Sequence, residues 1–588
     1  MLGERPAQRG LFEADHVYLD YVGRDTFYGF LASQRGKLFR DEDFAELYCP
    51  DNGRASVPPS LLATALLLQT YERVSDEEAK ARADFDLRWK VALGTEVENR
   101  PFAKSTLQLF RAHLVLHDKI RAIFQRSLRF AGQTGCMRKR RVKLALDTSN
   151  ILGKGAVKDT YNLLSDGIVK LARALAWGAG EPALSEAEGK LQAWASGRGL
   201  SRYFGSSVKG EANIDWDDES ARRAFLKEVV ADADRLLQMA RQALESSVDD
   251  VERERLTEAA ELLAQLLLQD IERRPDGPAI KEGVSRDRMV SVHDPEMRHG
   301  HKSKSRRFDG HKMALAVDTE SQLIAAVAVL PGNAPDSERA LALVEESEEN
   351  AQIEVEETIA DCAYGDGLTR QEFADAGRKL IARVPKRPKQ RHFPKEDFAI
   401  DLEAMTCECP VGQVTSRLVR RGRRKDRREE VTDLYAFQFD AAVCRSCPLR
   451  ASCVKGKSGK GRSVALHPQE SLLQEARAFQ RSEAYAPYRA LRQVAEHRVA
   501  RLIQLDARRA RYFGRRKTLF QLLIVATVAN LTLVATKTGL MRDPSEAKTR
   551  FSSHFSRILG AIRAFTGCLS AALKFGGTSR PTGNPVFG

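Results

Sequence analysis

Hydrophobic and polar positions along the 588-residue chain follow two periods, and these divide the chain into segments. Residues 1–135 place leucine and alanine at helical spacing, with Ser60 and Ser75 as expected helix caps. Residues 169–285 return to helical spacing, with charged residues on the opposite faces. Apolar runs of strand length lie between and after these stretches. The pattern therefore predicts an α/β fold, with a mixed sheet that carries helices on its faces.

The predicted strands can be placed one by one. Alternating apolar positions lead to Asp147, and two apolar strands are expected on either side of Thr319 and Glu320. A further strand is expected to stop at Asp361, before a short helix and a last strand. The predicted segments are 1–135 (helical and DNA-binding-like), 136–168 (first core strand), 169–285 (helical insertion), 286–385 (core strands and helices), 386–470 (basic, cysteine-rich insertion with little regular structure), 471–540 (a long helix and the last core element) and 541–588 (tail).

Charge narrows the class of partner. The chain holds 94 Lys and Arg against 80 Asp and Glu, a formal net charge of +14. This balance favours a polyanionic partner, nucleic acid before membrane, over the alternative of a basic but ordinary enzyme. The N-terminus has no apolar signal core, so a cytoplasmic protein is expected. The longest apolar run, 519–535, is interrupted by polar residues, which favours a buried helix or strand over a membrane span.

Acidic residues occupy the positions where catalytic groups are common in α/β folds. Asp147 and Asp361 are both expected at strand ends, and Asp159, after a glycine-rich loop, is a weaker rival. Carboxylates hold Mg²⁺, and a pair of such ions can activate an attacking oxygen and stabilise a leaving one. Glu496 is the third candidate, on a single helix predicted from Pro487 to Gly514. The alternative is that Glu496 only pairs with Arg492 at i,i+4 on the surface.

Basic side chains near these acids are candidates for contacts with DNA phosphates. The run RLVRRGRRKDRREE could instead be a solvated face, as charge runs usually are. The histidines His293, His299, His301 and His311 stand among lysines and arginines, which favours phosphate contact or a basic loop over a metal site. The predicted DNA-binding residues are Arg492, Arg498, Arg501, Arg420, Arg421, Arg423, Arg424 and Lys312.

Cysteines cluster in the basic segment. Without an export signal a reducing compartment is expected, where clustered cysteines more often bind metal than form disulfides. The two-residue gap between Cys444 and Cys447 suits a structural zinc ion. Five candidates compete for four positions, and the favoured set is Cys407 or Cys409 with Cys444, Cys447 and Cys453. The alternative is a group of reduced surface thiols. The isolated cysteines, expected to be structural, are Cys49, Cys136, Cys362 and Cys568.

Several separate stretches resemble one family. They are GRASVPPSLLATALLLQ, LALDTSNILGKGAVKDTYNLL, DPEMRHGHKSKSRRFDGHK, VLPGNAPDSERA, ADCAYGDG, CRSCPLRASC and ARYFGRRKTLFQLLIVATVANL. Across residues 20 to 540 the chain resembles bacterial insertion-sequence transposases of the DDE class, in the insertion-sequence 1182 branch. The resemblance implies an RNase H-like core with insertions and an acidic triad of Asp147, Asp361 and Glu496. It also implies Mg²⁺ or Mn²⁺, the terminal inverted repeats and target DNA as double-stranded partners, and a homo-oligomer on DNA.

The glutamate helix departs from the pattern of related transposases, Tyr-x2-Arg-x3-Glu-x6-Lys. Arg492 and Glu496 keep the three-residue gap. Tyr488 is one position too far from Arg492, and Ile503 stands where the lysine would be.

The sequence therefore predicts a transposase that binds the ends of its own element, cuts a strand and joins the freed 3′-hydroxyl to target DNA. Two rivals remain open. One is a catalytically inactive relative kept as a DNA-binding regulator, and the other is an RNase H-like nuclease without strand transfer. No phosphate-binding loop for nucleotides appears in a strand–turn–helix context, so nucleotide hydrolysis is not expected.

Overall fold

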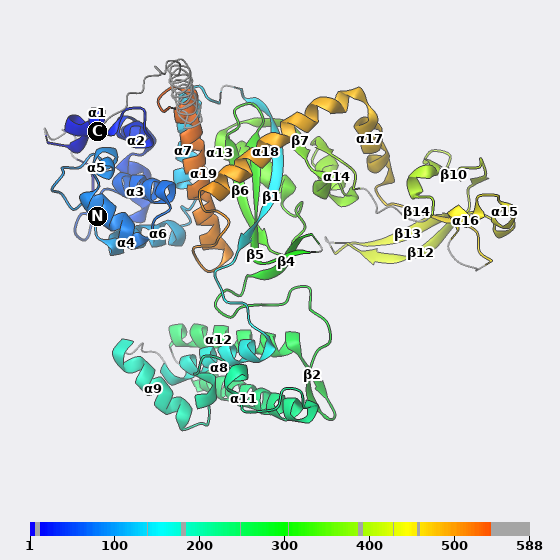
Figure 1. The fold of residues 1–588 in the computed structure, drawn as a ribbon, viewed down its shortest axis with the longest axis horizontal. Helices are drawn as coiled ribbons and strands as arrows, with labels where there is room; N and C mark the ends of the chain where they lie inside the picture. The colour runs from blue at the N-terminus through cyan, green and yellow to red at the C-terminus, as the bar shows by residue number, and fades with distance from the viewer. Residues whose placement is uncertain are drawn as a thin grey trace, which may run out of the picture.

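The computed structural model describes residues 1–5, 12–137, 139–177, 184–246, 249–303, 305–385, 392–426, 429–454 and 459–542. Cys568 and the predicted tail, beyond its first two residues, lie outside the described residues. Figure 1 shows a central sheet with the N-terminal helices on one side, while a helical insertion and a narrow arm extend from the sheet in two other directions.

The central sheet is mixed, as predicted. Its strand path is β4-β5-β1-β7-β8, and β6 also pairs with β5. β5 runs antiparallel to β1, β4 and β6, whereas β7 runs parallel to both β1 and β8. The strands are β1 Arg141–Leu152, β4 Arg298–Ser303, β5 Arg306–Asp318, β6 Ile324–Pro331, β7 Glu354–Ala360 and β8 Leu380–Ala382.

Helices cover both faces of this sheet. On one face, α13 (Ala340–Ala351) and α14 (Gly367–Asp375) pack on a core that includes Leu144 and Leu146 of β1. On the other face, α18 (Ala486–Gln504) lies over β1, β5 and β7, where Ala145 and Leu315 join the main core. Successive strand residues point to opposite faces, so the even and odd positions of β1 serve two different cores.

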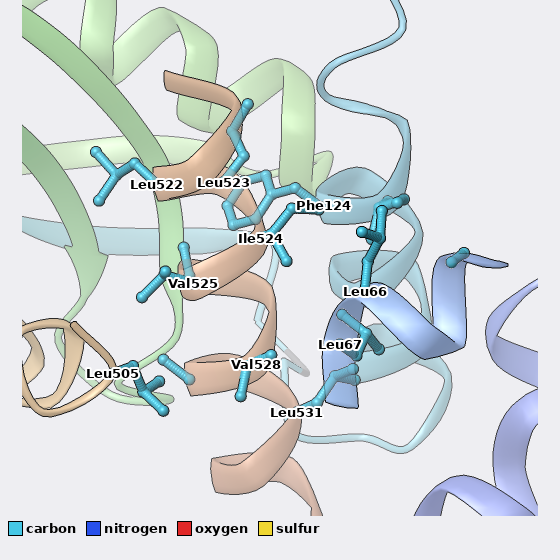
Figure 2. Close-up of a cluster of buried hydrophobic side chains, with 14 of the residues drawn as sticks. Leu66, Leu67, Phe124, Leu505, Leu522, Leu523, Ile524, Val525, Val528 and Leu531 are labelled. Carbon is cyan, nitrogen blue, oxygen red and sulfur yellow. The ribbon is translucent and has the colours of Figure 1, made fainter. Parts of the chain in front are cut away.

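A buried helix joins the sheet to the N-terminal helices. Figure 2 shows Leu523, Ile524 and Leu531 of α19 (Arg515–Lys537) on the side that faces the N-terminal helices, where Leu66, Leu67 and Phe124 lie. Leu522 and Val525 lie on the opposite side of α19. The N-terminal elements are α1 Ala14–Val22, α2 Phe27–Leu38, η1 Asp41–Leu47, α3 Pro59–Glu72, α4 Asp76–Phe85, α5 Leu87–Leu93, α6 Lys104–Leu116 and α7 Ala122–Gln133.

The apolar run 519–535 is this buried helix, as the sequence predicted. By length and composition α19 could cross a membrane, but 83% of its apolar window is buried inside the fold. One of its interrupting polar residues has a structural role, because the Asn530 side chain accepts from Ile324 N at 2.9 Å and donates to Ile324 O at 2.8 Å. This amide caps the free backbone edge at the start of β6 and so fixes α19 on the sheet.

The two predicted caps have different outcomes. The Ser75 hydroxyl accepts a hydrogen bond from Glu78 N and caps α4, as predicted. Ser60 lies inside α3, whose first turn begins after Pro58, so its prediction as a cap is wrong. Its hydroxyl instead accepts a hydrogen bond from Arg5.

The helical insertion begins earlier than predicted, at Thr160. Asp159 accepts hydrogen bonds from Tyr161 N at 3.0 Å and Asn162 N at 3.2 Å, so this carboxylate caps a helix. That contact gives Asp159 a structural role. The elements are α8 Thr160–Trp177, α9 Leu184–Ser196, η2 Ser201–Tyr203, α10 Val208–Glu211, α11 Glu219–Ser246, α12 Asp250–Asp270, β2 Ile271–Arg274 and β3 Gly277–Ile280.

Residues 392–466, here called the arm, contain more regular structure than predicted. Two three-stranded sheets form there, β11-β10-β9 and β12-β13-β14. These sheets could not be predicted from the sequence pattern, because a strand such as β12 is exposed over nearly its whole length and has no alternating apolar positions. The elements are η4 Lys395–Asp397, β9 Ala399–Asp401, β10 Thr406–Glu408, β11 Val414–Thr415, β12 Leu418–Lys425, β13 Val431–Gln438, α15 Ala441–Ser446, α16 Arg450–Cys453 and β14 Ser463–Leu466.

The helix predicted from Pro487 to Gly514 is shorter than expected. After α17 (Glu470–Arg481) and η5 (Glu483–Tyr485), α18 ends at Gln504, and Asp506 has a positive φ of 66°. The following backbone pairs with β1 instead: Leu152 N donates to Arg508 O at 2.7 Å, and Ala510 N donates to Leu152 O at 2.8 Å. Tertiary hydrogen bonds thus end a helix that the local sequence does not interrupt with glycine or proline.

Candidate active site

Asp147 lies inside β1 and not at its end, which corrects the sequence prediction. β1 pairs with β7 only as far as Ala145, whereas it stays paired with β5 to Leu152. The strand therefore continues as a two-stranded ribbon beyond the edge of β7. Asp147 stands just past that edge, and its carboxylate accepts a hydrogen bond from Thr148 N at 2.8 Å.

Asp361 follows β7 directly, as the sequence predicted. Its carboxylate caps the short helix η3 (Cys362–Tyr364) and accepts a hydrogen bond from Ala363 N at 2.8 Å. This local turn explains why a strand that ends at Ala360 is followed at once by a polar residue. Because β1 and β7 are parallel neighbours, Asp147 and Asp361 are brought to the same edge of the sheet.

Glu496 completes a shared cavity with the two aspartates. Asp147, Asp361 and Glu496 all line one cavity of about 470 Å³, although they come from β1, the end of β7 and α18. The alternative drawn from spacing is also present, because Arg492 pairs with Glu496 at 2.6 Å. The ion pair lies within the cavity wall, since Arg492 lines the same cavity, so it does not remove Glu496 from the site.

The cavity contains a fourth carboxylate that the sequence reading missed. Asp336, in the loop after β6, lines it together with the three predicted acids. Lys312 donates to Asp336 at 2.7 Å and to Ala334 O at 2.6 Å. Its signal in the sequence is weak, because Asp336 lies in a loop five residues beyond the end of β6 at Pro331, whereas Asp361 follows its strand directly. The cavity lined by Asp147, Asp336, Asp361 and Glu496 is called the acidic cavity below.

Burial and mutual repulsion make ionisation costly in the acidic cavity. Burial raises the pKa of Asp147 to about 6; the Thr148 amide and Arg492 oppose this rise, while Asp361 and Glu496 add to it. Burial also raises the pKa of Asp361, and the charge of Asp336 contributes in the same direction. The acids therefore hold more negative charge than their protein surroundings neutralise, which is the electrostatic setting that suits a divalent cation.

Basic residues line the wall of the same cavity. His301, Lys302 and Arg508 join Arg492 and Lys312 there. They stand beside the acids, where the negatively charged backbone of a nucleic acid would be attracted. His301 lines the cavity, whereas His311 is fully buried against Asp294, with Nε2 and Oδ2 3.4 Å apart.

Arg498 does not fit the role predicted for it. It is only 7% exposed, and burial lowers the pKa of its guanidinium to about 10. A side chain buried on the core-facing side of α18 does not present its charge to a DNA phosphate in this conformation, so the structure does not support the predicted contact for Arg498. Arg501 is half-buried, and its guanidinium donates to Gln504 at 3.3 Å.

The arginine run forms one strand of a ribbon in the arm. Arg420 and Arg423 donate to Asp433 of β13 at 2.7 and 3.1 Å, and Arg421 donates to Ser463 of β14 at 3.1 Å. A register shift between Arg420 and Gly422 marks a bulge. The hairpin therefore presents a row of exposed cations, which includes Arg424, along one edge strand.

The five clustered cysteines of the arm divide into one buried residue and four that share a cavity. Cys407 is fully buried beside Phe398 and Phe437, and burial raises the pKa of its thiol to about 11. The other four line one small cavity of about 30 Å³, where Arg462 N donates to Cys444 Sγ at 3.3 Å. Those four are Cys409, Cys444, Cys447 and Cys453.

Neither the acids of the acidic cavity nor the four clustered thiols are arranged tightly enough to coordinate a metal ion. Among the described residues, no three His, Cys, Asp or Glu side chains are grouped tightly enough to hold a metal ion. A cation in the acidic cavity, or among the four thiols, therefore requires these side chains to draw together. The donor types do fit: carboxylate oxygens suit Mg²⁺ or Mn²⁺, and four sulfurs suit Zn²⁺.

Two parts of the chain match known families. Residues 20–113 match the family described as transposase domain (DUF772), and residues 408–535 match the family described as transposase DDE domain. The first match covers most of the N-terminal helices, and the second contains Glu496. A DDE domain implies a metal-dependent nuclease or transposase, and the two matches together support a DDE-type transposase. Neither the curated proteins nor the solved structures contain a match.

Proposed function

We propose that this protein is a DDE-class insertion-sequence transposase that binds the ends of its element, cuts a strand and joins the 3′-end to target DNA. One observation carries the proposal: three acids separated by more than a hundred residues in the chain line a single cavity. The mixed sheet with carboxylates beside adjacent strands supports an RNase H-like core, and the motifs of the sequence favour the insertion-sequence 1182 branch.

Asp147, Asp361 and Glu496 are the residues that would hold Mg²⁺ or Mn²⁺. When bound, such ions activate an attacking oxygen and stabilise a leaving oxygen during in-line displacement. The chain itself contributes position and charge. Asp147 is rigid because it sits in a paired strand, Asp361 is fixed by its cap, and Arg492 holds Glu496 against the cavity. Asp336 is held by Lys312 and borders the same space.

The basic wall and the arm would hold DNA. Arg492, Lys302 and Arg508 lie within the acidic cavity, where a phosphate would neutralise them while it approached the carboxylates. The exposed arginines of β12 would bind the backbone further along the duplex. The outer part of the β12–β13 hairpin extends beyond its pairing with β14, so it is a two-stranded ribbon narrow enough to enter a groove. Arg501 and Lys312 remain proposed contacts, although both already have protein partners.

The four clustered thiols are the proposed zinc ligands. They would fix α15, α16 and the β10–β11 turn together, which are otherwise joined by a small apolar cluster. Metal analysis of the purified protein should find one zinc ion, and Cys409→Ser should lose it. Cys407→Ser is the matched control and should keep its zinc, because Cys407 lies outside the cavity. Zinc-free wild-type protein, or equal loss in both variants, would contradict the assignment.

The proposed function can be tested with DNA that carries matched terminal inverted repeats. The full chain with Mg²⁺ or Mn²⁺ should nick at the repeat ends and produce joined products with a target plasmid. Binding without nicking would favour a DNA-binding regulator, and nicking without joined products would favour a nuclease. A homo-oligomer is proposed on DNA because two ends must be held together, and sizing of the protein–DNA complex would measure it.

A further inference from the structure

A second polar cluster lies beside the acidic cavity, on the same three elements. Glu357 of β7 accepts a hydrogen bond from Tyr488 of α18 at 2.8 Å and forms an ion pair with Lys143 of β1 at 2.7 Å. The Lys143 ammonium also lies 5.2 Å from the centre of the Tyr488 ring. Lys379 adds a further ion pair with Glu357. Lys143, Glu357 and Tyr488 are called the clamp below.

The clamp has a regular relation to the three acids. Lys143 precedes Asp147 by four residues on β1, and Glu357 of β7 precedes Asp361, the residue directly after that strand, by four. Residues four apart on a strand point to the same face, so each acid lies on the face of the sheet that carries the clamp. On α18, Tyr488 and Glu496 are eight residues apart and flank Arg492 at helical spacing.

The clamp is the polar connection between α18 and the sheet. In the part of the chain that the structure describes, the Tyr488 hydroxyl is the only side-chain group of α18 that hydrogen bonds to a sheet strand. The other contacts are apolar: Leu491 packs against the cluster of Ile359 and Ile381, and Ala495 and Leu502 join the main core. Apolar packing is non-directional, so it resists separation better than it resists sliding or rotation of the helix.

We propose that the clamp is a positioning device, which fixes α18 against β1 and β7 so that Glu496 stays within reach of a cation held by Asp147 and Asp361. The inference rests on the proposed function of the acidic cavity. Tyr488 and Glu496 are about 12 Å apart along the helix axis at 1.5 Å per residue, so a small shift at the clamp reorients the distant carboxylate. Groups that orient metal ligands are known to change metal affinity by 10- to 100-fold when lost.

The primary test is Mn²⁺ binding by the full-length protein, measured by calorimetry without DNA. Tyr488→Phe removes one hydroxyl, and Glu357→Gln removes the shared charge. Both should weaken Mn²⁺ binding by about tenfold. Lys143→Arg keeps the charge beside Glu357 and should keep most of the wild-type affinity. Asp147→Asn, which removes a proposed ligand, should abolish binding and thereby locate the signal in the acidic cavity.

Glu348→Gln is the matched control. Glu348 pairs with Arg378 at 2.7 Å and accepts a hydrogen bond from Val355 N of β7, yet it belongs to α13 on the opposite face of the sheet. The variant should lose stability but keep its Mn²⁺ affinity. Equal affinity in all variants would overturn the inference, as would an equal loss in Glu348→Gln or an absence of Mn²⁺ binding by the wild-type chain.

A nicking assay separates this inference from the proposed function. Clamp variants should need about tenfold more Mn²⁺ for half-maximal nicking, with unchanged binding of end-containing DNA. A wild-type protein that binds Mn²⁺ through Asp147, with an affinity that depends on the clamp, but that never nicks DNA would overturn the transposase proposal and leave the clamp standing.

Discussion

Two polar clusters, the clamp and the acidic cavity, lie side by side on β1, β7 and α18, and the pKa values of their carboxylates are shifted in opposite directions. Glu357 is partly buried, which favours its neutral form, but hydrogen bonds from Lys143, Lys379 and Tyr488 lower its pKa to about 2. Asp147 is surrounded by other acids, and burial raises its pKa to about 6. The same three elements therefore carry one carboxylate that is fully compensated and one that is not.

This difference in pKa distinguishes a carboxylate that stabilises the fold from carboxylates that are available to a ligand. A compensated carboxylate such as Glu357 contributes to stability and has no unused capacity for a ligand. Among the residues that the structure describes, the four carboxylates of the acidic cavity form ion pairs with two cations, Arg492 and Lys312. Such clustering costs stability and is retained where an incoming cation supplies the missing charge.

The largest expected effect comes from removing charge at the uncompensated cluster. Asp361→Asn should reduce metal-dependent nicking on the order of 10³-fold, since a preorganised group that acts on the reacting charge is lost. Binding of end-containing DNA should change little. Glu356→Gln, an exposed carboxylate on the same strand, is the control and should behave as wild type. If both steps fail together in folded Asp361→Asn protein, the acid serves structure and the contrast between the clusters is lost.

The pH dependence of nicking should follow the raised pKa of Asp147. At limiting Mn²⁺ the rate should fall about tenfold per pH unit below about 6, because the protonated acid cannot hold the metal. Higher Mn²⁺ should move the midpoint to lower pH, since metal and proton compete for the same oxygens. A rate that stays flat from pH 7 to pH 5 at limiting metal, with DNA binding also constant, would contradict this assignment.

Without metal, Asp147→Asn should stabilise the protein at pH 7 by about 1–3 kcal/mol. The sign follows from the pKa, which is higher in the folded than in the unfolded chain. Between about pH 4 and 6 the native state binds more protons, so wild-type stability falls as pH rises through that window. Urea unfolding at pH 7 and at pH 3 measures the effect, and the gain should disappear at pH 3, where both states are protonated.

Removing the carboxylate of the clamp should change stability in the opposite direction to Asp147→Asn. Glu357→Gln should lower the free energy of unfolding at pH 7 by about 1 kcal/mol, a modest figure because solvent screens the pair. The folded-state pKa of Glu357 is lowered, so its contribution is present above the unfolded value and is lost as pH falls toward about 2. A double-mutant cycle with Lys379→Gln measures the coupling. A stabilised Glu357→Gln protein would show that the two clusters do not differ as described.

The elements of the core could be predicted because local pattern and tertiary structure agree there. The strands β5 to β8 and the position of Asp361 follow from apolar runs that stop at polar residues. The prediction that Asp147 stands at a strand end is wrong, because the sequence does not reveal that β1 continues beyond its pairing with β7. The break after Gln504 was invisible for the same reason: it is made by hydrogen bonds to Leu152, far away in the chain.

The site could be predicted from the sequence less completely than the fold. Three acids could be selected by their position after strands and on a helix border, and all three line one cavity. Asp336 was missed because its loop reads only as a turn, and the clamp was missed because its members gain meaning through strand register. The different surroundings of Cys407 and Cys409 also come only from the fold, which buries Cys407 and leaves Cys409 in one cavity with the other three clustered cysteines.

The burial of α19 has a consequence for how the chain is made. Leu66, Leu67 and Phe124 have no complete partner surface until residues 515–537 have left the ribosome. Contacts that join such distant segments form slowly and leave apolar surface open in the meantime. A message that ends before codon 515 would therefore yield a chain that cannot complete the core between the N-terminal helices and the sheet. Such a fragment would be a substrate for chaperones and proteases.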